Sequence, residues 1–177
     1  KLVPFGEYIP FRKLLKKSNF SLVGDDFSSG KELKLFKLKN KVKILPLICY
    51  EIIFPNISRE KNNDYNLIVN ITNDAWYGNS SGPYQHLALA KMRAVQEGVF
   101  LIRVANTGIS AIINNNGKIV KKINLNKKGI IDQELVLTKK NTVYSKFGDK
   151  IFFFLLIMLF VLFIILKTFG GITRKYE

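Results

Sequence analysis

The most reactive side chain in this 177-residue sequence is its only cysteine, Cys49, which ends an apolar run typical of a buried strand. Strand ends are where α/β folds tend to place reactive groups. A cysteine attacks through its thiolate, so a catalytic cysteine needs a base or a cation beside it. A lone cysteine at a strand end is also typical of a small buried hydrophobic side chain. The residues alone leave both interpretations open.

Two kinds of base could activate Cys49. His86 is the only histidine and would form a Cys–His pair, although an imidazole in the first turns of a helix also serves as a cap or hydrogen-bonding group. A carboxylate is the other option, and each acid could instead be a solvated or ion-paired surface group. The acids in ordered-looking segments are Glu7, Glu51, Asp74 and Glu97.

The cysteine and histidine counts restrict metal chemistry. One cysteine excludes an intrachain disulfide, a cysteine-cluster zinc site and an iron–sulfur site. One histidine excludes a histidine-rich metal site within this chain. We therefore expect no metal and no cofactor, and a thiol mechanism that needs neither.

Two further segments combine polar and aromatic groups. Residues 2–10, LVPFGEYIP, are unusually apolar and rigid for a chain segment with no strand or helix pattern. Residues 73–78, NDAWYG, follow an apolar run and contain the only tryptophan. Loops of this composition after a strand suit a binding site, and they also suit an ordinary packed loop.

The elements that must position these residues alternate between strands and a helix, which predicts an α/β layered domain. A helix is expected over Gly82–Glu97, with Ser80 or Ser81 as its cap, Pro83 in its first turn and Gly98 at its end. An Asn-rich turn at residues 114–117 predicts a hairpin. The expected strands are Val42–Cys49, Asn66–Thr72, Phe100–Ala105, Ile109–Ile113 and Lys118–Val120.

Two features qualify this outline. Pro46 cannot donate to a strand ladder, so it argues against a central strand and predicts a local irregularity. The segment Asn19–Lys41 is polar, charged and contains Gly and Ser, and we interpret it as a loop.

A membrane helix is predicted near the C-terminus. Ile151–Leu166 comprises sixteen apolar residues without a break, or about 24 Å of helix against a bilayer core of about 30 Å. The flanking Lys150 and Lys167 can snorkel outward. A buried core helix is the alternative, but no side of the run is polar. Arg174 and Lys175 favour a cytoplasmic tail, which would place the preceding domain on the outer side.

The net charge of +15 suggests an anionic partner, either nucleic acid or an acidic lipid surface. A compositionally biased genome rich in Lys, Asn and Ile codons would also produce it. The lysines are scattered or paired and do not alternate with aromatic residues, so we expect no nucleic-acid partner.

Taken together, the motifs resemble the nitrilase-type domain of the apolipoprotein N-acyltransferase family. Residues 2–10 are similar to that family's LVPFGEYVP. The other matching segments are residues 48–51 (ICYE), 73–78 (NDAWYG), 82–94 (GPYQHLALAKMRA) and 103–108 (RVANTG). The final apolar run matches the family's last membrane helix.

This resemblance implies a fold and a domain organisation. The fold would be α/β, the C-terminal portion of a nitrilase-like α-β-β-α sandwich followed by one transmembrane helix. Residues 1–147 would form a partial catalytic domain, residues 148–169 the membrane helix and residues 170–177 a short cytoplasmic tail. The catalytic domain would face the periplasm from a bacterial inner membrane.

The resemblance also implies roles. Cys49 would be the nucleophile of a Glu–Lys–Cys triad, taking an acyl chain from a phospholipid as a thioester and passing it to the N-terminal amine of a diacylated lipoprotein. The backbone N–H after Cys49 would bind the oxyanion. The remaining catalytic residues would be Glu7, Tyr50 and Glu51, and the substrate-binding residues would be Trp76, Tyr77, His86 and Asn106.

The family pattern is incomplete at the front of the sequence. The triad Glu lies well upstream in the family, and the triad Lys lies three residues before the Leu that matches Leu2. Lys1 lies one residue before Leu2 and is not assigned that role. We therefore expect the 177-residue chain to be inactive on its own.

Two alternatives stay open at this point. A membrane-tethered amidase of the nitrilase type would use the same Cys49 and pass the acyl group to water. A non-enzymatic, membrane-anchored binding domain would need neither Glu nor Lys. The acceptor separates the first from a transferase, and the upstream gene sequence tests the second.

Overall fold

The computed structural model describes residues 2–12, 25–30, 32–39, 41–55 and 64–173. Its centre is a six-stranded mixed sheet in the order β1-β2-β3-β4-β5-β6. The strands are β1 (Phe36–Lys37), β2 (Lys43–Ile48), β3 (Leu67–Asn73), β4 (Phe100–Asn106), β5 (Ser110–Ile113) and β6 (Ile119–Ile123). Strands β2, β3 and β4 are parallel, whereas the pairs β1–β2, β4–β5 and β5–β6 are antiparallel.

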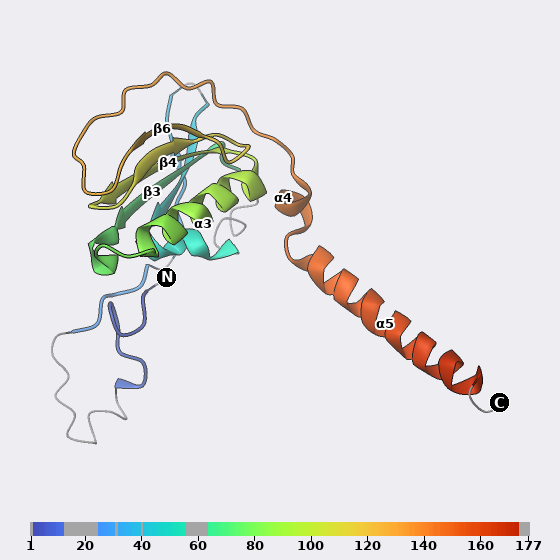
Figure 1. Ribbon diagram of the computed structural model, residues 1–177. Coiled ribbons are helices and arrows are strands. Elements are labelled where there is room, and N and C mark those ends of the chain that lie inside the picture. The colour runs from blue at the N-terminus through green and yellow to red at the C-terminus, as the bar shows by residue number, and fades with distance from the viewer. Residues whose placement is uncertain (1, 13–24, 31, 40, 56–63, 174–177) are drawn as a thin grey trace.

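One face of the sheet is covered by helix α3 (Gly82–Glu97), as Figure 1 shows. Alternate strand residues point to this face and form register rows, such as Leu45, Ile68 and Leu101. These residues are fully buried against apolar α3 residues such as Ala90 and Ala94. Alternate residues of the strands and one face of α3 therefore pack together in one core.

The ends of α3 form as expected from the sequence. The Ser80 hydroxyl accepts the N–H of Gly82 at 3.1 Å, while Ser81 occupies the cap position without a side-chain bond. Gly98 ends the helix in the left-handed region at a φ of 67°. A side chain at Gly98 would also lie 2.2 Å from the carbonyl oxygen of Lys140, so the position excludes a Cβ for two reasons.

On the opposite face of the sheet the carboxyl ends of β2, β3 and β4 are uncovered in the part of the chain that the structure describes, whereas Leu67 and Ile112 on the same face are buried. Ile48, Ile71 and Val104 are register neighbours on β2, β3 and β4 and are 67%, 60% and 52% exposed. Such a row of exposed branched side chains is typical of a surface that packs against another layer.

The strands are followed by an extended segment and two helices. The segment passes around the outside of the sheet (Figure 1) and is anchored where Lys140 N–H donates to the Gly98 carbonyl at 2.8 Å. It leads into α4 (Val143–Phe147), whose cap is the hydroxyl of Thr142. Helix α5 (Lys150–Thr173) then projects away from the sheet, and its described side chains from Phe152 onward are exposed.

Helix α5 contains the expected apolar run and is long and apolar enough to cross a membrane, by length and composition. Its exposed apolar surface contradicts the alternative of a buried core helix within the described residues.

Two expectations need correction. β2 keeps an unbroken register with β3 through Pro46, so no irregularity forms there. Proline is tolerated because β1 pairs only with Lys43 and Ile44, which leaves Pro46 one described strand neighbour. The expected loop Asn19–Lys41 contains the short strand β1, while its residues 19–24, 31 and 40 lie outside the described residues. The short helix α4 was not expected from the sequence.

Candidate active site

Cys49 lies at the sharp turn between β2 and the short helix η2 (Cys49–Ile53). Its φ is 48°, in the left-handed region that residues other than glycine rarely adopt. Such strain persists where the surroundings enforce it, and a nucleophile on a strained strand-to-helix turn presents its reactive atom beyond the sheet. The carboxylate of Glu51 supports the turn by accepting the N–H of Ile48 at 2.9 Å.

Helix α3 holds the far end of this turn through Arg93, which is 1% exposed. Its guanidinium donates to the carbonyls of Ile52 and Ile53 at 3.3 and 3.2 Å, and to the side chain of Gln96 at 2.6 Å. One planar cation therefore satisfies two carbonyls at the end of η2 and ties the cysteine turn to the main helix.

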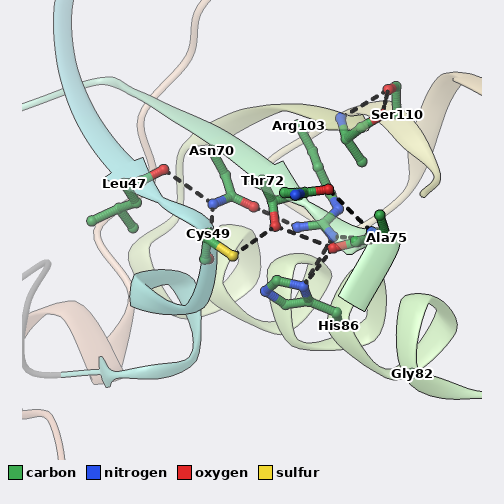
Figure 2. Close-up of polar contacts among 12 residues, drawn as sticks. Leu47, Cys49, Asn70, Thr72, Ala75, Gly82, His86, Arg103 and Ser110 are labelled. Atoms are coloured by element: carbon green, nitrogen blue, oxygen red, sulfur yellow. Dashed lines mark hydrogen bonds and ion pairs between the residues drawn. The ribbon is translucent and has the colours of Figure 1, made fainter. Parts of the chain in front are cut away.

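The thiol itself contacts Thr72 on the neighbouring strand β3. Figure 2 shows the sulfur of Cys49 directed toward the Thr72 hydroxyl, and the Sγ–Oγ1 distance is 3.2 Å. The same hydroxyl lies 3.1 Å from Oδ1 of Asp74, the first residue of the short helix η3 (Asp74–Tyr77). Thr72 thus connects the thiol to a buried carboxylate.

Asp74 is 1% exposed and is surrounded by donors. His86 Nδ1 lies 3.0 Å from Oδ1, and Arg103 Nη2 lies 2.7 Å from Oδ2. Burial acts to raise the pKa of this carboxyl, but the hydrogen bond from His86 and the charge of Arg103 outweigh it and lower the pKa below its ordinary value. Asp74 is therefore ionised and acts only as an acceptor.

Asn70 links this ion pair back to the cysteine turn. Its side-chain oxygen accepts from Arg103 Nη1 at 2.5 Å, and its amide donates to the carbonyls of Leu47 and Cys49 at 3.1 and 3.2 Å. The strand register explains the contact, because Leu47, Asn70 and Arg103 form one row across β2, β3 and β4. Figure 2 shows the side chains of Asn70 and Arg103 beside Cys49.

Gly108 leaves room for the carboxylate of Asp74. A Cβ at this position would lie 2.2 Å from Oδ2 and 2.6 Å from the Cβ of Asp74. Both atoms are closer than real contacts allow, so only glycine fits beside the Asp74–Arg103 pair.

Aromatic side chains surround the turn. The ring of Tyr77 packs edge-on against His86, with 5.8 Å between centroids, and Tyr50 packs in the same way against Phe54 at 5.3 Å. Burial raises the pKa of Tyr77, and the proximity of the Cys49 thiol contributes to the same shift. Trp76, in contrast, is 79% exposed.

The remaining expected site residues occupy two places. Asn106 is exposed at the carboxyl end of β4 and donates to the side chain of Asn73, its register partner on β3, at 3.2 Å. Glu7 accepts the backbone N–H of Val3 at 2.8 Å and so stabilises its own loop. The hydrogen bond of the Glu7 carboxylate is therefore made within its own loop, residues 3–7, and not to Cys49.

The structure assigns different positions to the candidate bases. His86 is buried and its Nδ1 faces Asp74 and Arg103, while its Nε2 has no hydrogen-bond partner within the described residues. The hydrogen bonds that the described residues give His86 include none to Cys49, and its role in substrate binding stays a prediction. Glu97, at the other end of α3, accepts from the hydroxyl of Tyr65 at 2.8 Å. Asp74 reaches the thiol through Thr72.

The sequence reasoning missed Asn70, Thr72 and the partner role of Arg103. One signal was available: Asn70 and Thr72 alternate with apolar residues along an apolar run, and Asp74 continues the same spacing just beyond it. This spacing places polar groups on one face of a buried strand and at its end. Within the described residues, no group of three or more His, Cys, Asp or Glu side chains could hold a metal ion.

Comparison with known proteins identifies the class to which this fold and site belong. The model of the carbon-nitrogen hydrolase family matches residues 1–140, and the chain is a member of that family. The curated proteins that it resembles are named apolipoprotein N-acyltransferases, so the resemblance expected from the motifs is confirmed.

Two of these relatives show the extent of the similarity. The protein of Rickettsia prowazekii is 48% identical over 92% of this chain and 33% of its own length. That of Rhodopseudomonas palustris is 44% identical over 84% of this chain and 28% of its own length. The chain thus spans about a third of the length of the curated relatives it matches. Among solved structures, an amidase from Nesterenkonia sp. AN1 aligns over 56% of this chain and 41% of its own, with 18% identity and a TM-score of 0.46.

Proposed function

We propose that this chain is the nucleophile-bearing part of an apolipoprotein N-acyltransferase. The observation that carries the proposal is the similarity to proteins of that name over nearly the whole chain, combined with a cysteine in a strained turn that a buried polar network supports. The thiol of Cys49 is the acyl carrier, and a membrane phospholipid and a diacylated lipoprotein are the donor and acceptor.

The proposed reaction has two acyl transfers. In the first, the thiolate of Cys49 attacks an ester carbonyl of the phospholipid, the C–O bond breaks, and the lysophospholipid leaves as an alcohol after taking up the thiol proton from a base. In the second, the acceptor amine attacks the thioester carbon, loses a proton to the base, and expels the thiolate. The backbone N–H of Tyr50, the residue that follows Cys49, donates to the developing oxyanion. A thioester divides one difficult transfer into two easier steps.

In this proposal the general base belongs to the part of the protein upstream of this chain. Asp74 is committed to Arg103 and His86, and Glu51 binds the backbone of the cysteine turn. The resemblance supplies a Glu and a Lys upstream of this chain for that task. We therefore propose that the 177 residues bind and present the nucleophile but do not complete the reaction alone.

We also propose a bacterial inner-membrane location with α5 as the last span. Residues 1–147 then form the partial catalytic domain on the periplasmic side, residues 148–169 the span and residues 170–177 a cytoplasmic tail. Both substrates carry acyl chains in the bilayer, so a tethered site raises their effective concentration. A reporter active only in the cytoplasm, fused after Glu177, should be active; an inactive reporter at normal expression would contradict this orientation.

The thioester is tested by the intact mass of the Cys49 peptide from the complete gene product, purified from membranes. We expect a fatty-acyl mass that neutral hydroxylamine removes and that Cys49→Ser lacks. Adding a diacylated lipopeptide should then discharge the acyl group as an amide. Discharge to free fatty acid, with no amide formed, would instead identify an amidase, and an unmodified Cys49 in membranes would contradict an acyl-enzyme mechanism.

A further inference from the structure

The Thr72 hydroxyl lies close to two acceptors but can donate its single proton to only one of them at a time. The Oγ1 atom lies 3.2 Å from Cys49 Sγ and 3.1 Å from Asp74 Oδ1. Both distances suit a hydrogen bond donated by the hydroxyl, yet a threonine hydroxyl has a single proton. Because ionised Asp74 only accepts, the direction of the bond to sulfur must depend on where that proton points.

The charge state of the sulfur decides between the two directions. A neutral thiol can donate its own proton to Thr72 Oγ1, which leaves the hydroxyl proton for Asp74. A thiolate has no proton and only accepts, so the hydroxyl must turn toward it. The hydroxyl bond to the thiolate and the bond to the Asp74 carboxylate are both charge-assisted. The rotation toward sulfur is favoured because Asp74 keeps two other donors, His86 and Arg103, when the hydroxyl leaves it.

Asp74 tolerates the loss of the Thr72 proton because two other donors hold it. His86 Nδ1 lies 3.0 Å from Oδ1 and Arg103 Nη2 lies 2.7 Å from Oδ2, so the carboxylate remains paired in both states. Each of these partners is at most 2% exposed, so water cannot easily replace the hydroxyl. The network thus keeps a free hydroxyl proton within reach of the sulfur.

We propose that Thr72 is an additional catalytic residue whose hydroxyl rotates from Asp74 to Cys49 Sγ whenever the sulfur is anionic. The inference rests on the proposed acyl transfer for its use in turnover. In the first step the hydroxyl stabilises the attacking thiolate. In the second step the thioester sulfur regains its charge as the C–S bond breaks, and the hydroxyl turns back to the leaving thiolate.

Other charged groups around the thiol are kept constant in the test. They lie on each element packed near Cys49: Tyr50 and Glu51 on η2, Asp74 and Tyr77 on η3, His86 and Arg93 on α3, and Arg103 on β4. Substituting Thr72 alone leaves all of them in place, so a change in the ionisation of the Cys49 thiol is caused by the loss of the Thr72 hydroxyl.

The experiment measures the alkylation rate of Cys49 by iodoacetamide in the complete gene product, read by peptide mass across the pH range around about 8.5, where an ordinary thiol ionises. We expect Thr72→Val to move the midpoint up by about one pH unit, which is about a tenfold smaller thiolate fraction near neutrality. Thr72→Ala should give the same shift without added bulk, and Thr72→Ser should retain the wild-type midpoint.

The matched control is Thr138→Val, which removes the hydroxyl of an exposed residue in the extended segment before α4. This hydroxyl accepts from the Asn115 side chain at 3.0 Å. It should leave the midpoint unchanged. An unshifted midpoint in both Thr72→Val and Thr72→Ala would overturn the proposal, as would a slower rate at every pH with no shift, which indicates a structural role alone. Alkylation needs no acyl donor, so this result stands apart from the thioester measurement: a thioester that never forms contradicts the transferase, not the hydrogen bond.

Discussion

At the scale of single residues, the candidate site depends on polar groups buried beneath one cysteine. Cys49, Thr72, Asp74, His86 and Arg103 form a continuous chain of hydrogen bonds and an ion pair on the α3 side of the sheet. A buried carboxylate is costly unless donors surround it, and here an imidazole and a guanidinium do so. The network therefore constrains both the position and the charge of the groups around the thiol.

Gly108→Ala tests how tightly this network is packed. The new Cβ would overlap the Asp74 carboxylate, so we expect a loss of about 1–3 kcal/mol in stability from overpacking, together with impaired acyl transfer. Thermal unfolding and acylation of Cys49 in the complete gene product measure the two effects. Gly30→Ala is the matched control, because a Cβ there meets nothing within 4 Å. Equal unfolding temperatures and equal Cys49 acylation in the two variants would show that Asp74 moves aside without loss of stability or activity.

The lowered pKa of Asp74 predicts a dependence of stability on pH. The folded-state pKa lies below the ordinary 3.8, so the stabilisation is fully present above that pH and is lost as pH falls through the folded value. Asp74→Asn should cost about 3–5 kcal/mol near neutral pH, because Arg103 loses its buried partner.

The difference in unfolding temperature between wild type and Asp74→Asn should then shrink as pH falls below 3.8. Asp132→Asn, which makes the same change at an exposed residue, serves as the control. A gap between wild type and Asp74→Asn that stays constant in acid would contradict the assignment of an ionised Asp74.

At the scale of elements, the nucleophile is held between a strand and a helix. Strand β2 delivers Cys49 at its carboxyl end, and α3 fixes the following turn through Arg93. The parallel arrangement of β2, β3 and β4 places their carboxyl ends at one edge, which is where polar side chains from all three can meet. The site is thus a product of strand direction as much as of residue type.

Arg93→Met tests the tie between α3 and η2. Loss of the guanidinium removes the donor from the buried carbonyl of Ile52 and the half-buried carbonyl of Ile53. A buried group left unpaired costs about 1–3 kcal/mol. We expect faster amide hydrogen exchange across Cys49–Ile53 with little change in the β5–β6 hairpin. Lys122→Met, which removes the same charge from an exposed strand position, should leave exchange in η2 unchanged. Uniformly faster exchange would indicate global destabilisation instead of a local tie.

At the scale of the whole molecule, two apolar surfaces remain without a described partner. Helix α5 exposes the apolar side chains from Phe152 to Leu166, and the sheet face opposite α3 exposes Ile48, Ile71 and Val104. A bilayer suits the first because of its length and composition. The second suits another β-layer, since the expected fold is an α-β-β-α sandwich and the described residues contain one sheet.

Ile71→Asp tests whether further chain covers that face in the complete gene product. Burying an unpaired carboxylate is expensive, so we expect a loss of several kcal/mol and poor folding if a second sheet packs there. Ile130→Asp, at a position 94% exposed, should be nearly neutral. Equal tolerance of both substitutions would show that the face stays open to solvent.

The sequence by itself determined the elements with strong periodic or compositional signals. The bounds of α3 followed from Pro83 near its start and Gly98 at its end, because both residues have narrow backbone preferences. The run Ile151–Leu166 required a helix that is apolar on all sides, and the motifs around Cys49 indicated the family.

Only the tertiary structure decided which of the polar residues share a site. His86, Asp74 and Arg103 lie 12 to 29 positions apart and meet because of strand register and the packing of α3. The left-handed turn at Cys49 and the contact with Thr72 likewise depend on β2 and β3 lying side by side. Local preference cannot specify such pairings, since they arise from long-range packing. For the same reason the sequence could not show that His86 lies buried beside Asp74 and Arg103.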